Sequence, residues 1–229
     1  MNNYIPFVFA IIPSIFLVRY FYLKDINKPE PMGLIVKVFI AGFICTIPIV
    51  FIEIIVDTIV QSFNFNLIIY LFLQAFIVAG LCEETIKLMV IKIFIYNNKH
   101  FDERMDGIVY TIVASLGFAC LENIMYVSEG GLSVALIRSF TAVPLHAFCS
   151  GIMGYYIGKA KFSKTNSKEY ILEGLFYAVC IHGLYNFVLF MGGIYSFIII
   201  PILIISYKKL KSYINIAIKE DLKDLKSNI

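Results

Sequence analysis

Seven apolar segments, each close to the length that crosses a lipid bilayer, constrain this chain more than any other feature. A membrane helix needs about 20 mainly apolar residues to cross a hydrocarbon core about 30 Å thick. Of the 229 residues, 60% are hydrophobic and only 15% are charged, against about 25% charged in a soluble domain. The sequence therefore predicts an all-α fold, a polytopic membrane helix bundle. About seven transmembrane helices are expected, at 4–23, 33–56, 67–91, 107–127, 139–158, 171–190 and 194–207.

The distribution of Lys and Arg predicts how the bundle is oriented. Cytoplasmic loops of membrane proteins carry an excess of these residues. Here most of them lie in loops 19–28, 92–106 and 159–170 and in the C-terminal tail, and Arg138 lies on the opposite side. We therefore expect the N-terminus outside and the C-terminus in the cytoplasm. The expected division is a transmembrane domain at 1–207 and a basic cytoplasmic tail at 208–229.

The net charge of +3 is too small to indicate a nucleic-acid partner, so the lipid bilayer is the expected partner of most of the chain. The five cysteines all lie in apolar segments without CxxC spacing. We interpret them as small buried hydrophobic residues rather than as a disulfide or zinc framework.

Ionisable residues inside the apolar segments are the candidate functional residues, because a charge in the membrane costs several kcal/mol. The third segment contains Glu83 and Glu84, with Lys87 one helical turn later, close enough to pair with either carboxylate. One acid would be enough for an ion pair. The second acid indicates a group whose proton affinity is tuned by a neighbouring like charge. The alternative is a structural Glu–Lys pair that braces helices.

Three further segments carry polar groups of the same kind. The fourth contains Glu122 beside Asn123, the fifth contains His146, and the sixth contains His182 with Asn186 on the same helix face. A single histidine on an apolar helix is more often structural than catalytic. Two histidines and three glutamates on four successive segments favour a functional cluster.

Such a cluster can hydrolyse a peptide bond. A carboxylate can deprotonate water for attack on the carbonyl, and a histidine beside an amide can donate hydrogen bonds to the oxyanion. We expect no metal cofactor, because Lys87 opposes a cation beside the glutamates. Zinc is the alternative, held by His146, His182 and either Glu84 or Glu122, since two His and one carboxylate suffice for catalytic zinc.

The order of these motifs resembles the PrsW family of intramembrane proteases, which are distant relatives of the type II CAAX prenyl endopeptidases. The similar residues are Glu-Glu-x-x-Lys at 83–87, Phe-x-x-x-Glu-Asn at 118–123 and the two later histidines. The loop that contains Asp25 and Pro29-Glu30-Pro31 and the pair Asp106-Gly107 also fit. The resemblance runs from about residue 20 to residue 190.

The resemblance implies a multi-pass protease of the bacterial cell membrane. Its expected substrate is a single-span anti-sigma factor, which it would cut first, on the outward side, to release a stress-response sigma factor. One of Glu83 and Glu84 is implied as the base that activates water. Glu122 matches the acid of the second motif, where it is either a proton shuttle or a metal ligand, and His182 with Asn186 resembles the relatives' His-x-x-x-Asn motif.

Two other functions stay open at this point. A proton-coupled transporter also places Glu, His and Lys within the membrane, although the two halves of this sequence show no similarity to each other. A non-catalytic membrane scaffold is the second alternative, and it would tolerate Glu83→Gln and Glu84→Gln. The expected depth of the cluster favours the protease with an outward-side cut if the third helix spans about 74–96, with 67–73 as a lead-in at the outer surface.

Overall fold

A computed structural model describes residues 4–25 and 28–227, and every regular element among them is helical. The predicted all-α bundle is therefore confirmed. The elements are α1 (Ile5–Tyr22), α2 (Met32–Ser62), α3 (Leu67–Leu73), the π-helix η1 (Gln74–Leu81), α4 (Cys82–Phe94), α5 (Arg104–Phe140), α6 (Ala142–Phe162), α7 (Ser167–Met191), the 3₁₀-helix η2 (Gly193–Ile198) and α8 (Ile199–Ser227).

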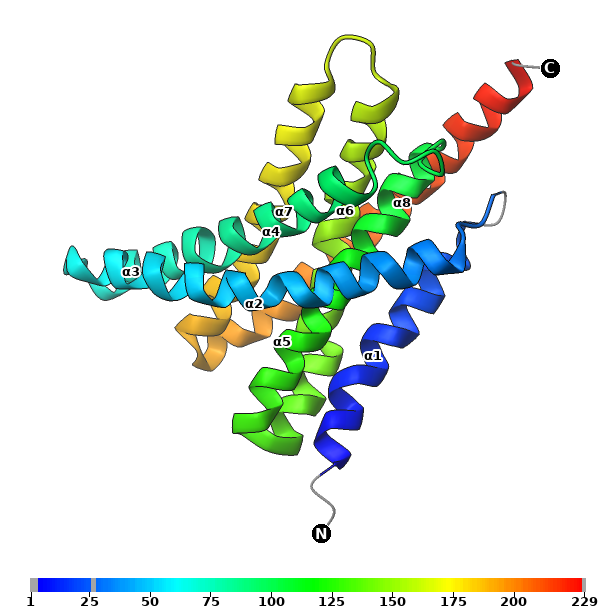
Figure 1. Cartoon of the computed structure of the whole chain (residues 1–229). Coiled ribbons are helices and arrows are strands. Elements are labelled where there is room, and N and C mark those ends of the chain that lie inside the picture. The colour runs from blue at the N-terminus through cyan, green and yellow to red at the C-terminus, as the bar shows by residue number, and fades with distance from the viewer. Residues whose placement is uncertain (1–3, 26–27, 228–229) are drawn as a thin grey trace.

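Six helical stretches among the described residues are long and apolar enough to cross a membrane. The longest, Arg104–Phe162, contains both α5 and α6 and reverses direction. The reversal lies at Gly131, where φ is 67°, a left-handed conformation that glycine adopts without steric cost. In Figure 1, α5 runs towards the lower end of the view, and the chain returns beside it to α6. The count of seven helices and the orientation of the termini stay predictions.

Close backbone contact between helices brings the functional elements together. A Cβ atom on Gly42 of α2 would lie 1.9 Å from the carbonyl oxygen of Ala114 on α5. Glycine is therefore required there for the two helices to approach each other. Gly107 of α5 meets Gly154 and Gly158 of α6 in the same way. Small residues of this kind allow membrane helices to pack closely.

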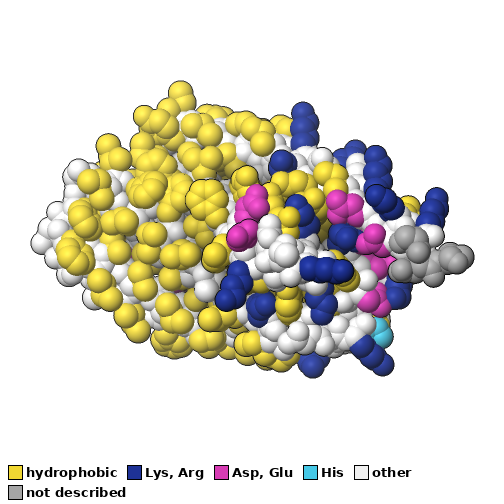
Figure 2. All heavy atoms as spheres, turned by 90° about the horizontal axis from the view of Figure 1, so that it is seen from above, with side chains coloured by type: hydrophobic (Ala, Val, Ile, Leu, Met, Phe, Trp, Pro, Cys, Tyr) yellow, Lys and Arg dark blue, Asp and Glu magenta, His cyan; other side chains and the backbone are white. Residues whose placement is uncertain are grey.

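The outer surface of the bundle matches a lipid environment over a wide area. Figure 2 shows large hydrophobic side chains gathered over one part of the molecule and charged side chains at one end. On α2, exposed apolar side chains repeat at helical spacing, as Ile40, Ile44, Ile47, Phe51 and Ile55 illustrate. The localisation expected from the sequence is therefore supported by the surface as well as by the length of the helices.

Some helix boundaries differ from the prediction. The third stretch is helical from Leu67 to Phe94 without a break, and its hydrogen-bond pattern changes to that of a π-helix at Gln74. Pro201 does not interrupt the last helix, because it lies in the first turn of α8, where a missing N–H is tolerated. α8 continues through residue 207, and the division at 207/208 stays a prediction.

Candidate active site

The structure brings together the charged residues that the sequence places on four separate helices. The π-helix η1 precedes α4 and lies against α7, where a Cβ atom on Gly183 would come within 2.4 Å of the Phe76 ring. π-helical segments are rare and often occur at functional sites. The groups that converge are the candidate catalytic residues and are called the catalytic cluster below: Glu83, Glu84 and Lys87 of α4, Glu122 of α5, His146 of α6 and His182 of α7.

Lys87 lies at the centre of the catalytic cluster and is fully buried. Its Nζ donates to Glu83 Oε2 at 3.1 Å and to Glu84 Oε1 at 2.8 Å. It also lies 2.9 Å from His146 Nδ1 and 4.4 Å from the centre of the Phe118 ring. The predicted pairing of Lys87 with both acids is confirmed. A buried charge needs such partners, because leaving it unpaired costs several kcal/mol.

Glu84 uses both carboxylate oxygens in contacts with neighbouring helices. Oε1 accepts from Lys87 and from His182 Nδ1, the latter at 2.9 Å. Oε2 accepts from the Ser150 hydroxyl at 2.8 Å. Glu84 has no exposed surface and does not line a cavity. Its place in the structure is therefore that of an anchor for α4, α6 and α7.

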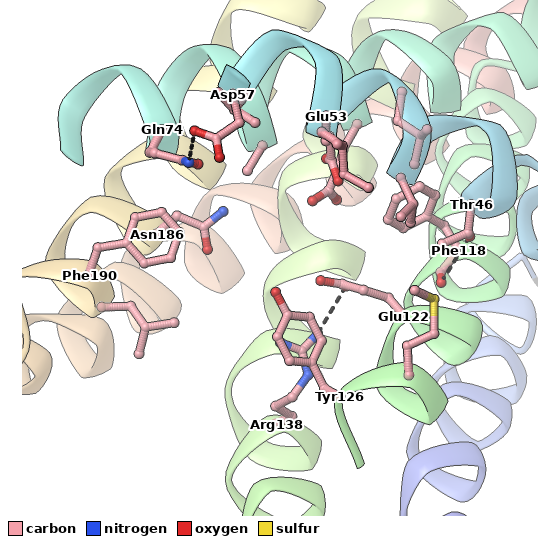
Figure 3. A pocket seen from close by; sticks show the side chains of 18 of the residues that line it. Thr46, Glu53, Asp57, Gln74, Phe118, Glu122, Tyr126, Arg138, Asn186 and Phe190 are labelled. Carbon is pink, nitrogen blue, oxygen red and sulfur yellow. Dashed lines mark hydrogen bonds and ion pairs between the residues drawn. The ribbon is translucent and has the colours of Figure 1, made fainter. Parts of the chain in front are cut away.

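Glu83 faces a cavity of about 470 Å³ that opens between α2, η1, α5 and α7. Its hydrogen bond to Lys87 uses Oε2, and the same oxygen lies 3.9 Å from His182 Nε2. Glu122 and Asn186 line this cavity as well. Figure 3 shows both side chains directed into the open space. Of the adjacent acids, Glu83 is the one that a molecule in the cavity can reach.

The hydrogen bonds of the two histidines indicate their tautomers. His146 receives the Lys87 ammonium at Nδ1, so its Nε2 carries the hydrogen that it donates to Glu122 at 2.8 Å. Neutral His182 donates from Nδ1 to the Glu84 carboxylate, which leaves a lone pair on Nε2. The two rings lie 5.0 Å apart between centroids. The tautomers of the neutral rings are thus assigned from the hydrogen-bonding pattern.

Arg138 is part of the site, although the sequence places it in an outward loop. Its guanidinium pairs with Glu122 at 2.9 Å, and its Nε donates to Asn123 Oδ1 at 2.6 Å. Asn123 also lies against α1, where its side chain reaches the carbonyl oxygen of Ala10. Asn123 therefore contacts the cluster through Arg138. The loop prediction is wrong because the helix continues past 127 and turns back at Gly131.

Two acids of α2 that line the cavity were not predicted from the sequence. Glu53 and Asp57 both line the cavity, and Glu53 Oε1 is buried without a hydrogen-bond partner among the described residues. Asp57 accepts hydrogen bonds from Gln74 and Tyr70. The same rule that selected Glu83 applies to Glu53, since Ile49-Val50-Phe51-Ile52 and Ile54-Ile55-Val56 flank it. The position of Glu53 within an apolar segment was the feature that could have identified it as a candidate functional residue.

Comparison with known proteins identifies the family. The family model described as "PrsW family intramembrane metalloprotease" matches residues 30–206. The chain is 37% identical over 182 residues to "Protease PrsW" of Geobacillus kaustophilus (strain HTA426), covering 79% of this chain and 77% of the relative. The chain belongs to the PrsW family. "Protease PrsW" of Oceanobacillus iheyensis is 37% identical over 86% of this chain and 88% of its own length, and that of Bacillus subtilis (strain 168) is 35% identical over 85% and 87%. No solved structure matches this chain.

Membership of the PrsW family confirms that the chain is a peptide-bond hydrolase of the bacterial membrane with several membrane-spanning helices. The family resemblance predicted from the sequence is confirmed as well. The comparisons do not support the transporter and scaffold alternatives, because every curated relative named above is a protease.

The PrsW family is described as a metalloprotease family, and the donor set of this chain fits a metal ion. One donor atom from each of Glu83, Glu84, His146 and His182 lies within 4.8 Å of the others. Two imidazoles with carboxylates are typical of catalytic zinc. Lys87 bonds to three of these four residues, so binding an ion at His146 Nδ1 requires the lysine to give up that contact.

Proposed function

We propose that this PrsW family protease makes the first cut in a single-span anti-sigma factor, and that Glu83 activates the attacking water. The observation that carries the proposal is the difference between the two adjacent acids. Glu83 lines the cavity, whereas the two oxygens of Glu84 are taken up by Lys87, His182 and Ser150. A general base must reach the water it deprotonates.

The walls of the cavity suit a segment of a membrane-embedded polypeptide. Apolar side chains line it from α2, η1, α5 and α7, as Ile49, Val78, Met125 and Leu189 illustrate. Polar groups lie among them, including Gln74 and Asn186 (Figure 3). Apolar walls with a few directed polar groups are typical of binding sites for specific ligands. The polar groups can bond to the backbone of an unwound substrate helix, whose peptide groups otherwise lack partners in lipid.

The proposed reaction moves one proton through two residues. Glu83 accepts a proton from water, and the resulting hydroxide attacks the peptide carbonyl. The proton passes to His182 Nε2, which lies 3.9 Å from Glu83 Oε2 and has a lone pair available. The imidazolium that forms is stabilised by the Glu84 carboxylate, as a buried carboxylate stabilises histidine in other hydrolases. The Nε2–H of His182 then donates a hydrogen bond to the oxyanion, and His182 transfers this proton to the leaving amine as the peptide C–N bond breaks.

Glu122 and His146 have a positioning role in this scheme. Arg138 neutralises Glu122 from one side, and the Nε2–H of His146 donates to it from the other. His146 in turn accepts from Lys87 at Nδ1, so the ammonium keeps its direction towards Glu83. When a zinc ion is bound by the histidines and glutamates, it supplies Lewis-acid polarisation of the carbonyl and lowers the pKa of water.

The proposal is tested by reconstituting the purified chain in lipid with a single-span anti-sigma factor. Wild type is expected to cleave the substrate near its outward end. Glu83→Gln is expected to be folded and to cleave about 10²–10⁴ times more slowly, whereas Glu169→Gln, an exposed acid on α7, should match wild type. Each protein is assayed without a chelator, with a strong chelator, and with zinc added after the chelator. Wild-type rates in Glu83→Gln would contradict the assignment of the base. Cleavage of unrelated peptides but of no anti-sigma factor would contradict the substrate.

A further inference from the structure

A second group of buried acids lies at the opposite end of α5 from the bend at Gly131. Asp25 follows α1, Glu30 precedes α2, and Asp106 lies in the first turn of α5. Each of the three offers an oxygen atom, and these oxygens all lie within 4.8 Å of one another. The side chains are 3%, 4% and 0% exposed. Asp106 is about 24 Å along the helix from Glu122, so this acidic triad is separate from the catalytic cluster.

No ion pair neutralises the triad among the described residues. The nearby Lys28 pairs with Asp102, and Arg104 pairs with three acids of α8. Glu103, itself buried, adds a further negative charge to the surroundings of Asp25. The electrostatic influence of His100 reaches Glu30, and that of Lys28 reaches Glu103. Buried carboxylates are normally paired or bound to a metal.

Two oxygens of the triad are buried without a hydrogen-bond partner among the described residues, Asp25 Oδ2 and Asp106 Oδ1. The other oxygen of Asp106 is used, because it accepts from the backbone N–H groups of Asp102 at 2.8 Å and Glu103 at 2.7 Å. Glu30 accepts from the Tyr110 hydroxyl. The backbone and Tyr110 thus hold Asp106 and Glu30 in place, and these two carboxyl groups also interact with each other. Lone pairs stay available on Asp25 Oδ2 and Asp106 Oδ1.

The pKa of Asp25 reflects the same surroundings. Burial, together with the negative charges of Glu103, Glu30 and Asp221, raises the pKa of Asp25 to about 7. Burial also raises the pKa of Glu30 above its usual range. Each carboxylate therefore lies in a place that favours either a proton or a cation.

We propose that Asp25, Glu30 and Asp106 form a binding site for a hard divalent cation, Mg²⁺ or Ca²⁺. The donors are all oxygens, which these ions prefer, and no histidine or cysteine belongs to the group. Ca²⁺ lies 2.3–2.6 Å from its ligands, so two oxygens that bind one ion are at most about 5 Å apart, and the three oxygens here meet that limit. The ion links the segment between α1 and α2 to the start of α5.

Thermal unfolding of the full-length chain in detergent, after removal of metal with EDTA, tests the site. At a hundredfold excess over Kd, Mg²⁺ or Ca²⁺ is expected to raise the midpoint for wild type by about 5–10 °C. Asp25→Asn and Asp106→Asn should lose this shift. The matched control Asp102→Asn, a neighbouring exposed acid, should retain it, and so should Glu83→Gln, which removes a donor of the catalytic cluster.

Elemental analysis of the purified chain supplies the second measurement. About one Mg or Ca per chain is expected in wild type and in Glu83→Gln, and none in Asp25→Asn, whose substitution lies outside any helix. Absence of the ion from wild type together with no thermal shift would overturn the proposal and leave a proton shared by Glu30 and Asp106 as the explanation. A shift that persists in Asp25→Asn and Asp106→Asn would overturn it as well.

Discussion

The catalytic cluster and the acidic triad lie in one bundle, and the negative charge of their buried carboxylates is balanced in different ways. In the catalytic cluster, Lys87 lies between Glu83 and Glu84, and Arg138 pairs with Glu122. In the triad, no side-chain cation of the described chain forms an ion pair with any of the three acids. The contrast indicates that the protein itself supplies the balancing charge in the catalytic cluster, where we propose that the reaction takes place. At the triad, the charge must come from outside the chain or from a proton.

The largest expected effect comes from removing the cation of the catalytic cluster. Lys87→Met should lower the free energy of unfolding by about 3–5 kcal/mol, because it leaves buried carboxylates without their partner. Denaturant unfolding in detergent measures the change. Lys92→Met, an exposed position on the same helix, should stay within about 0.5 kcal/mol of wild type. Equal stability of the two variants would show that Lys87 does not balance the acids.

A smaller effect is expected from the donor that completes the hydrogen bonding of Glu84. Ser150→Ala removes the hydroxyl that binds Glu84 Oε2 and should lower the free energy of unfolding by about 1–3 kcal/mol. Ser128→Ala, at an exposed hydroxyl on α5, is the matched control and should have little effect. If Ser150→Ala is as stable as that control, Glu84 is not the anchor described above.

A pH dependence of stability is also expected at the triad. The pKa of Asp25 is raised to about 7 in the folded chain, so the folded state binds more protons than the unfolded state between about pH 4 and pH 7. Stability in EDTA should therefore fall as the pH rises through that interval. Unfolding midpoints at pH 5 and pH 8 measure the fall. The difference between the midpoints at pH 5 and pH 8 should be smaller in Asp25→Asn, and smaller in wild type when the divalent cation is present. The same difference in both cases as in wild type with EDTA would contradict this role of Asp25.

Much of the site was predictable because intramembrane charge is conspicuous in a sequence. Glu83, Glu84, Glu122, His146 and His182 were all selected by their presence in apolar segments. The same criterion covers Glu53 and would have selected it. The fold class followed from segment length, which the bilayer sets independently of how the helices pack.

Other features depend on packing, which the sequence does not specify directly. The distinction between Glu83 and Glu84 depends on which of the two side chains lines the cavity, although the two residues are neighbours in the chain. Arg138 reaches Glu122 because the chain reverses at Gly131. The triad brings Asp25 and Glu30, which both lie between α1 and α2, to Asp106 at the distant start of α5, and its members lie at helix ends where charge is unremarkable.

Glu83 is the proposed base, and rescue of a truncated variant by a small carboxylic acid tests this role. The measurement is the initial rate of substrate cleavage by Glu83→Ala and by Glu84→Ala as the formate concentration increases, at constant ionic strength. We predict that formate partly restores cleavage in Glu83→Ala, because that position lines the cavity, and not in Glu84→Ala, because that position is enclosed. Wild-type cleavage by Glu83→Ala without formate, or rescue of Glu84→Ala instead, would contradict the account.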